Sequence, residues 1–336
     1  MSDIQPEPVE WLWEPYIPRG AISLIQGDGG MGKTTAALAI AAAVSRGDAL
    51  PGGFVGEPAA VIVQNAEDSY CKKIRPTLEL SGADCDLIEV IDENEQELSL
   101  SDGRIEDAII RTNAKLLIID PVQAYLGGRN MNSAGGVRPL MKHLGTVAAR
   151  HGCAVLLVGH MNKKGGAPQY RGLGSIDIYA AARSVMTVGK LPLDENMRVI
   201  VHNKSNLSAP GASQAFGLDD NGGFCWLGEC DATVDEVMSG KPKQESQFAK
   251  ARRLIETALA NGPVPSADIE QMAEKEGISF KTFKRAKEAL GVISYQRGRL
   301  WYWDIPIEVE YEDCSSSEGQ NGSEGQITAL VPLSQI

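Results

Sequence analysis

The sequence predicts a doubly wound α/β domain with a mainly parallel sheet over residues 1–238, and two observations lead to this class. First, runs that are almost continuous in Ile, Val, Leu and Ala recur at short intervals, as do strands that are buried on both faces of a parallel sheet. Second, amphipathic helical stretches lie between the runs, and strand–helix alternation is typical of a parallel sheet covered by helices. A chain of 336 residues has room for such a core and a smaller second domain.

These patterns place the elements in order along the chain. The runs that predict parallel strands are residues 21–26, 59–65, 87–92, 114–120 and 154–160, and the amphipathic stretches are residues 35–46, 104–112 and 137–150. Four later runs, at residues 184–189, 198–203, 214–218 and 224–227, follow one another more closely. The segment Asp-Asp-Asn-Gly-Gly between the last two is typical of a hairpin turn. We therefore expect the later strands to extend the sheet in antiparallel fashion.

A glycine-rich motif follows the first of these strands. Residues 27–34 match the pattern GxxxxGK[ST] and stand between a predicted strand and a predicted helix, which is the context that a phosphate-binding P-loop requires. Glycines let backbone N–H groups surround the phosphates, and the helix N-terminus adds its positive dipole. Lys33 is expected to reach the β- and γ-phosphates of ATP, and Thr34 to ligate Mg²⁺. The expected nucleotide-binding set is Gly27, Asp28, Gly29, Gly30, Met31, Gly32, Lys33, Thr34 and Thr35.

Polar residues at three other predicted strand ends complete the expected site. Asp120 ends an apolar strand and, downstream of a P-loop, is expected to hold Mg²⁺ together with Thr34. Glu67 follows the second strand, which we place beside the P-loop strand, and is the candidate to orient or deprotonate the attacking water. Asp68 is the alternative acid, or a cap for the helix that follows. His160 ends the fifth strand and would lie beside the γ-phosphate as a sensor.

Together these motifs resemble the RecA-like hexameric ATPases of the plasmid RepA replicative-helicase type, over residues 10–228. Residues 11–20 are similar to the segment that leads into the P-loop in that family, and residues 66–68 to its acidic motif. His160 with Asn162 and Lys163 is similar to its histidine motif. The segment from residue 170 resembles one that ends in an arginine finger, here Arg183, and residues 201–206 resemble a later motif whose lysine is here Lys204.

The resemblance implies a RecA-like fold, hydrolysis of ATP with Mg²⁺, and a homo-oligomer, expected to be a hexamer. Each active site would lie between two subunits, one supplying the P-loop and Glu67 and the next supplying Arg183 and Lys204. Two polar stretches, at residues 127–136 and 161–174, would face a central channel and bind single-stranded DNA. The residues expected to contact that DNA are Arg129, Lys163, Lys164, Tyr170 and Arg171. Flexible surface loops are the alternative interpretation of both stretches.

A basic module follows an expected linker at residues 239–247. Residues 243–304 carry 11 basic and 8 acidic side chains, a net charge of +3 in a chain whose net charge is −12. Residues 248–306 have the predicted order helix, helix, turn, helix, hairpin and resemble a winged helix, whose third helix would enter the major groove of DNA. The expected contacts are Lys281, Lys284 and Arg285 on that helix, with Arg297 and Arg299 in the hairpin. A winged helix that docks on a protein is the alternative.

The remaining sequence limits the setting in which the protein works. Residues 307–336 are rich in Ser, Glu, Gly and Gln, carry no basic side chain, and are expected to be disordered. No apolar run is long enough for a membrane helix and the first residues are acidic, so we expect a cytoplasmic protein with no membrane partner. The six cysteines show no CxxC spacing and no His at zinc spacing, so we expect reduced thiols.

Two functions of different classes remain open at this point. The first is a ring-forming, DNA-stimulated ATPase that acts as a replicative helicase of a mobile element. The second is a DNA-binding replication or regulatory protein in which ATP is a switch rather than a fuel. The winged helix favours the second, because plasmid helicases of this type usually lack one. A recombinase-like filament ranks last because few residues precede the P-loop, and nothing resembles the acceptor site of a small-molecule kinase.

Overall fold

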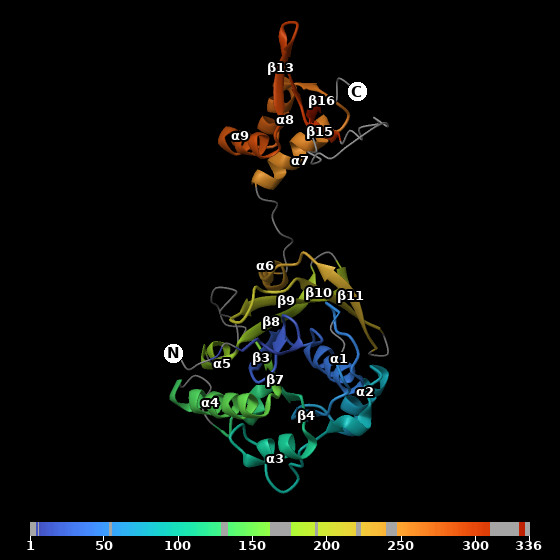
Figure 1. Cartoon of the computed structure of the whole chain (residues 1–336), viewed down its shortest axis with the longest axis vertical. Coiled ribbons are helices and arrows are strands. Elements are labelled where there is room, and N and C mark those ends of the chain that lie inside the picture. Colours follow the sequence, from blue (N-terminus) through green and yellow to red (C-terminus); the bar gives the residue numbers. More distant parts are fainter. Residues whose placement is uncertain are drawn as a thin grey trace, which may run out of the picture. The chain divides into compact units, whose positions relative to one another are not determined.

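The chain folds into two compact units, residues 1–243 and 244–336, and each is described by itself (Figure 1). The computed structural model describes residues 5, 7–53, 56–128, 134–161, 176–191, 194–219, 223–239, 247–309 and 329–332. The boundary between the units falls inside the linker that the sequence predicts at residues 239–247. The polar composition of that segment therefore marks a real division of the chain.

The first unit contains a nine-stranded sheet that is mostly parallel, as the sequence predicts. Its parallel strands are β3 (Ile22–Gly27), β4 (Val61–Asn65), β5 (Ile88–Glu89), β6 (Leu116–Asp120), β7 (Ala154–His160) and β8 (Ser184–Leu191). Antiparallel strands β9 (Asp194–Ser205), β10 (Ser213–Leu218) and β11 (Phe224–Cys230) extend it. Strands β3, β4 and β6 are buried along their whole length, because helices cover both faces of this half of the sheet.

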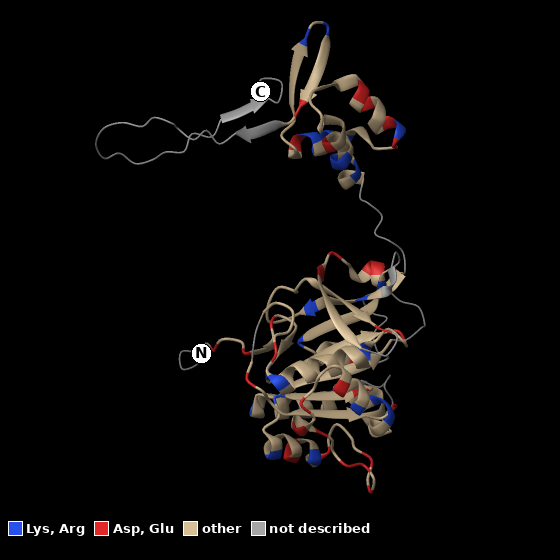
Figure 2. Ribbon diagram, turned by 90° about the vertical axis from the view of Figure 1, so that its right-hand side faces the viewer, with Lys and Arg blue, Asp and Glu red and all other residues tan. Residues whose placement is uncertain are grey.

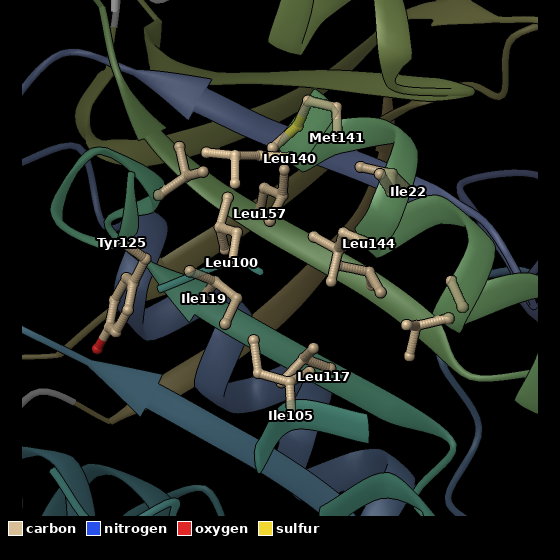
Figure 3. Close-up of a cluster of buried hydrophobic side chains, with 14 of the residues drawn as sticks. Ile22, Leu100, Ile105, Leu117, Ile119, Tyr125, Leu140, Met141, Leu144 and Leu157 are labelled. Atoms are coloured by element: carbon tan, nitrogen blue, oxygen red, sulfur yellow. The ribbon is translucent and has the colours of Figure 1, made fainter. Parts of the chain in front are cut away.

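Two apolar clusters cover the two faces of this sheet. On one face lie α1 (Lys33–Arg46), the π-helix η1 (Tyr70–Ile74) and α2 (Arg75–Leu80), and on the other lie α3 (Gly103–Thr112), α4 (Ala134–His151) and α5 (Ile176–Ala181). Figure 3 shows the second cluster, in which Leu140, Met141 and Leu144 of α4 pack over Leu117 and Leu157 of the sheet. Smaller elements complete the unit: β1 (Trp11–Trp13), β2 (Ile17–Pro18), η2 (Cys85–Leu87), η3 (Val122–Tyr125) and α6 (Val234–Ser239).

The order of the strands corrects one expectation. The sheet runs β11-β10-β9-β8-β3-β7-β6-β4-β5, so two strands separate β4 from the P-loop strand β3. The expectation that Glu67 follows a strand beside the P-loop strand was therefore wrong, because the chain crosses three positions after β3 and then fills the gap with β6 and β7. Asp120, at the end of β6, lies between the strand of Glu67 and the strand of His160. All these strands are parallel, so their carboxyl ends still meet at one edge of the sheet.

The second unit has its own apolar core. Its elements are α7 (Gln247–Leu259), β12 (Val264–Pro265), α8 (Ser266–Lys275), α9 (Phe280–Ala289), β13 (Ile293–Arg297) and β14 (Leu300–Asp304), and the strands form an antiparallel sheet in the order β12-β14-β13. Ile255, Ile269, Phe283 and Trp303 are buried together at the centre. Gly298, with a φ of 66°, makes the turn between β13 and β14 in a conformation that favours glycine. The predicted order of helices and hairpin is thus present.

The tail differs in part from the expectation of disorder. The first residues of the tail belong to β15 (Pro306–Val309), which pairs antiparallel with β16 (Ala329–Pro332). The second strand lies in the short apolar stretch near the end of the sequence, whereas the composition of the tail as a whole is polar. Residues 310–328 and 333–336 lie outside the described part of the chain. Across the described residues, no helix has both the length and the apolar character that crossing a membrane requires.

Candidate nucleotide site

The P-loop joins β3 to α1 at the carboxyl edge of the sheet, as the motif requires. Gly27 ends β3 so close to the neighbouring strand that a Cβ there would overlap the carbonyl oxygen of Val188. Gly32 precedes α1 with a φ of 88°, and a Cβ there would lie 3.2 Å from Cδ of Arg198 and 3.3 Å from Cε2 of Phe216. The loop thus fits against β8, β9 and β10 only with glycine at these two positions. This close backbone path leaves main-chain N–H groups to surround a phosphate.

Lys33 opens α1 and is held inside the loop. Its side chain is 4% exposed, and Nζ donates a hydrogen bond of 2.7 Å to the carbonyl oxygen of Asp28. Burial lowers the pKa of Lys33, while the nearby carboxylates of Asp120, Asp28 and Glu67 raise it. An ammonium group carries three N–H donors, so Lys33 at this position could also donate hydrogen bonds to the oxygens of a bound phosphate group.

Thr34 and Asp120 come together as the sequence predicts. The Thr34 hydroxyl donates a hydrogen bond of 2.6 Å to Oδ2 of Asp120, and Asn65 Nδ2 donates one of 3.3 Å to the same oxygen. Burial raises the pKa of Asp120, and the hydroxyl of Thr34 opposes that shift. A hydroxyl and a carboxylate at this separation offer the oxygen ligands that Mg²⁺ prefers, and Lys33 supplies the adjoining cation, so the residues present fit ATP and Mg²⁺. Thr35 follows in the first turn of α1.

Glu67 and His160 meet across the end of β6. Oε2 of Glu67 lies 3.3 Å from Nε2 of His160, and both side chains face solvent, at 55% and 41% exposure. The side chain of Asn65 shapes the turn that carries Glu67, because its Oδ1 accepts hydrogen bonds from the backbone N–H groups of Glu67 and Asp68. An acid with free lone pairs beside a histidine can hold a water molecule in place.

Asp68 has a different environment from Glu67. Its carboxylate pairs with Nζ of Lys73 at 2.7 Å. Asp68 does not cap the helix that follows, because the cap of η1 is Ser69, whose side chain accepts a hydrogen bond of 3.3 Å from the backbone N–H of Lys72. That part of the expectation was wrong. The ion pair turns Asp68 toward η1, so the structure favours Glu67 as the acid of the site.

Arg183 and Lys204 lie at the opposite edge of the sheet from the P-loop. The backbone N–H of Arg183 donates a hydrogen bond of 2.7 Å to the carbonyl oxygen of Ile22, the first residue of β3. Since β3 has six residues, the two edges are roughly 20 Å apart at ~3.3 Å per residue. Lys204 Nζ donates to the carbonyl oxygens of Tyr179 at 2.8 Å and Ala182 at 2.7 Å. Burial lowers the pKa of Lys204, and the nearby Arg183 lowers it further.

The expected DNA contacts divide into two groups. Arg129, Lys163, Lys164, Tyr170 and Arg171 lie outside the described residues. In the second unit, Lys281, Lys284, Arg285, Arg297 and Arg299 are exposed, and Figure 2 shows basic residues at the tip of the β13–β14 hairpin. The guanidinium of Arg285 lies 5.4 Å from the ring centre of Phe248, so it is held over α7.

Sequence reasoning missed three residues of the P-loop edge. Asn65 is the register partner of Asp120 in the parallel pair of β4 and β6, Arg198 reaches Gly32 from β9, and Gln123 donates a hydrogen bond of 3.2 Å to the carbonyl oxygen of His160. Only Asn65 had a signal in the sequence, as the polar end of a strand one residue before the acidic motif. Within the described residues, no group of three or more His, Cys, Asp or Glu side chains could hold a metal, and the cysteines found there are free thiols.

These contacts place a phosphate-binding loop, an oxygen-ligand pair and an acid at the carboxyl edge of a mostly parallel sheet. The first unit therefore has the architecture and the phosphate-binding loop of a P-loop ATPase domain. In agreement, residues 2–166 match a family model described as an AAA domain, which covers the P-loop, Glu67, Asp120 and His160.

A solved structure is also similar to this chain: a KaiC-like protein from the hyperthermophilic archaeon Pyrococcus horikoshii. The similarity covers 66% of this chain and 100% of that one, with a TM-score of 0.46 and 19% sequence identity. No curated protein sequence matches the chain.

Proposed function

We propose that this protein is a DNA-stimulated ATPase that hydrolyses ATP between the subunits of a homo-oligomeric ring, expected to be a hexamer acting as a helicase. The observation that carries the proposal is the separation of the candidate catalytic residues. Glu67, His160, Asp120 and Lys33 share the carboxyl edge of the sheet, whereas Arg183 is tied to the first residue of β3 at the amino edge. One chain alone cannot bring Arg183 to its own P-loop without breaking the sheet.

The chemistry at the carboxyl edge follows from the environment of each side chain. Glu67 orients the attacking water and accepts its proton, since its carboxylate faces solvent and, in the described part of the chain, lies at hydrogen-bond distance from His160 alone. Mg²⁺, when bound, supplies charge that offsets the charge on the β- and γ-phosphates. Thr34 and Asp120 would hold that ion, and Lys33 would contact the phosphate oxygens once it leaves the carbonyl of Asp28. His160 reports phosphate occupancy to Glu67 through their shared contact.

The amino edge fits the surface that a neighbouring subunit would contact. A cavity of about 920 Å³ lies there between α4, α5 and the start of β3, and its lining includes Arg138, Lys142, Arg150 and Arg183 against the single acid Asp177. A basic lining favours an acidic neighbour, and the P-loop edge carries the exposed carboxylate of Glu67. Lys204 is engaged with the end of α5, two residues from Arg183, so in this arrangement it positions the finger rather than reaching outward.

The second unit supports the DNA part of the proposal. It has the helix and hairpin order of a winged helix, with exposed Lys281 and Lys284 on α9 and Arg297 and Arg299 at the hairpin tip. In a winged helix the third helix enters the major groove and the hairpin contacts phosphates. Because this unit has a core of its own, it also favours the second candidate function, a DNA-binding regulator switched by ATP.

The first experiment measures ATP turnover by the full chain with Mg²⁺, with and without single-stranded DNA. We expect DNA to raise turnover and Lys33→Ala to abolish it. The matched control is Lys115→Ala, which removes a lysine that precedes β6 and whose Nζ donates a hydrogen bond of 2.8 Å to Asn113 Oδ1, away from the P-loop. Turnover that is the same with and without DNA would contradict the helicase function and favour the DNA-binding regulator. Strand separation measured on a forked duplex then decides between helicase and switch.

The second experiment tests whether Arg183 acts on a neighbour. Arg183→Ala and Glu67→Gln are each expected to be nearly inactive, because an arginine supplied in trans contributes about 10³–10⁵ in turnover. Mixed in equal amounts, they should regain about a quarter of the wild-type turnover, since in about a quarter of the interfaces an intact Glu67 on one subunit faces an intact Arg183 on the next. A mixture no more active than its components contradicts the action in trans.

A further inference from the structure

Gln123 connects two segments of the P-loop edge that are far apart in the sequence. It lies in η3, three residues after Asp120, and its Nε2 donates a hydrogen bond of 3.2 Å to the carbonyl oxygen of His160. Its Oε1 is buried and has no hydrogen-bond partner among the described residues. The one hydrogen bond found for this amide therefore joins the segment after β6 to the end of β7.

The peptide that Gln123 contacts is a junction of the site. The ring of His160 lies 3.3 Å from the carboxylate of Glu67, and the backbone N–H of Met161 donates a hydrogen bond of 3.3 Å to the carbonyl oxygen of Gly27 in the P-loop. Three parts of the site thus meet at the His160–Met161 peptide: the P-loop, the acid and η3. A small shift of this peptide changes the position of the His160 ring relative to Glu67.

We propose that Gln123 is a positioning residue that couples the segment after Asp120 to His160 and, through His160, to Glu67. The inference rests on the proposed function, because the effect that Gln123 would transmit to the acid is that of bound DNA. Arg129 follows η3 by four residues and Lys163 follows His160 by three, and both are expected DNA contacts. Gln123 ties η3 to the His160 peptide, and the two expected DNA-binding stretches continue from these described ends. DNA bound at either stretch would therefore act on His160 and, through His160, on Glu67.

The test compares Gln123→Leu with the wild type in the full chain, using ATP, Mg²⁺ and single-stranded DNA. We expect the ratio of turnover with DNA to turnover without it to fall by about threefold to tenfold, in the range of coupled neighbouring residues. The KM for ATP should change by less than about twofold, because the hydrogen bond of Gln123 goes to His160 and not to Lys33 or Thr34, which would hold the phosphates and Mg²⁺.

Gln214→Leu is the matched control. Gln214 is a buried glutamine of β10 whose Nε2 donates one hydrogen bond of 2.8 Å, to the Tyr16 hydroxyl, and whose Oε1 also has no partner among the described residues. Gln214→Leu removes the same amide group at a position far from His160, so the ratio of turnover with DNA to turnover without it should stay at the wild-type value. An unchanged ratio in Gln123→Leu, or an equal fall in Gln214→Leu, overturns the proposal.

A double-mutant cycle with His160→Ala identifies the route. If Gln123 acts through the His160 ring, Gln123→Leu changes little in the His160→Ala background, whereas an additive loss overturns the proposal. If the wild type itself shows no response to DNA, the DNA part of the proposed function fails. Gln123 is then judged by kcat without DNA: a loss that disappears in the His160→Ala background supports the link, and an additive loss contradicts it.

Discussion

The first unit holds two polar clusters, each centred on a histidine, and they differ in almost every physical respect. The carboxyl-edge cluster consists of Asn65, Glu67, Asp120 and His160, and the side chains of Glu67 and His160 are 55% and 41% exposed. The buried-histidine cluster consists of Tyr16, Ser184, His202 and Gln214, and His202 is only 4% exposed. Each contains a histidine and a side-chain amide that take part in hydrogen bonds.

The buried-histidine cluster satisfies both ring nitrogens of His202 with hydrogen-bond partners inside the protein. Nδ1 of His202 accepts a hydrogen bond of 2.9 Å from the backbone N–H of Gly211, which leaves the ring proton on Nε2, 3.0 Å from the hydroxyl of Ser184. Ser184 in turn donates to the carbonyl oxygen of Tyr16, whose ring centre lies 5.1 Å from that of His202. Burial lowers the pKa of His202 to about 4, so the ring is neutral at physiological pH.

The difference shows that the fold keeps the candidate catalytic groups exposed and uses buried polar groups to hold its strands together. At the carboxyl edge, Glu67 and His160 keep lone pairs and protons available to solvent, while Asn65 and Asp120 fix the backbone beneath them. In the buried-histidine cluster, the polar groups join β8, β9 and β10 to the segment at Tyr16 and none faces solvent. A titratable group can act on a substrate only where its atoms remain accessible. The exposure of its side chain, and not the presence of a histidine, is therefore what makes His160 rather than His202 a candidate catalytic residue.

The largest expected effect is that of Glu67→Gln on turnover. We expect kcat to fall by about 10²–10⁴, because the amide cannot accept a proton from water. Affinity for ATP with Mg²⁺, measured by calorimetry, should stay within about twofold, because Glu67 does not contact the Thr34–Asp120 pair. A variant that retains more than a tenth of the wild-type turnover would show that another acid does this work.

Sequence reasoning predicts the parts of this site that depend on local pattern. Lys33, Thr34 and Asp120 were identifiable, because a P-loop and a strand-terminal aspartate each have a fixed sequence context. The contact of Gln123 with His160 was not, because it depends on which strands are neighbours, and the strand order was the feature predicted wrongly for β4. Arg198 approaches Gly32 only because the antiparallel strands fold back beside the P-loop. Register and strand order are set by packing across the whole sheet, and the pattern of a single segment does not predict which strands become its neighbours.

The next effect concerns stability rather than activity. His202→Leu should lower the free energy of unfolding by about 2 kcal/mol, since the Ser184 hydroxyl and the Gly211 N–H lose a buried partner. Turnover per folded molecule should change little, because this cluster holds no group of the site. Chemical denaturation and an ATPase assay on the same sample separate the two quantities. A clear loss of turnover per folded molecule would mean that the two clusters are coupled.

The pH dependence of stability sharpens the same contrast. The unfolded chain binds a proton on His202 below its ordinary pKa of 6.5, whereas the folded chain does so only near pH 4. The stabilisation from a neutral His202 is therefore full above pH 6.5 and decreases as pH falls toward 4, by no more than about 3 kcal/mol. The difference in unfolding free energy between wild type and His202→Leu should shrink over this interval. A difference that stays constant from pH 7 to 4.5 contradicts the buried neutral ring.

The smallest expected effect is that of Asp68→Asn, and it tests whether exposure and position, rather than charge alone, select the catalytic acid. Asp68 neighbours Glu67 in sequence, but its carboxylate is paired with Lys73 at 2.7 Å and is 27% exposed. An exposed ion pair of this kind contributes at most about 1 kcal/mol, so stability should change little. We expect kcat to change by less than about threefold, as befits an acid outside the reacting geometry. If Asp68→Asn lowers turnover as strongly as Glu67→Gln, both acids take part, and the distinction between a paired and a free carboxylate at this edge fails.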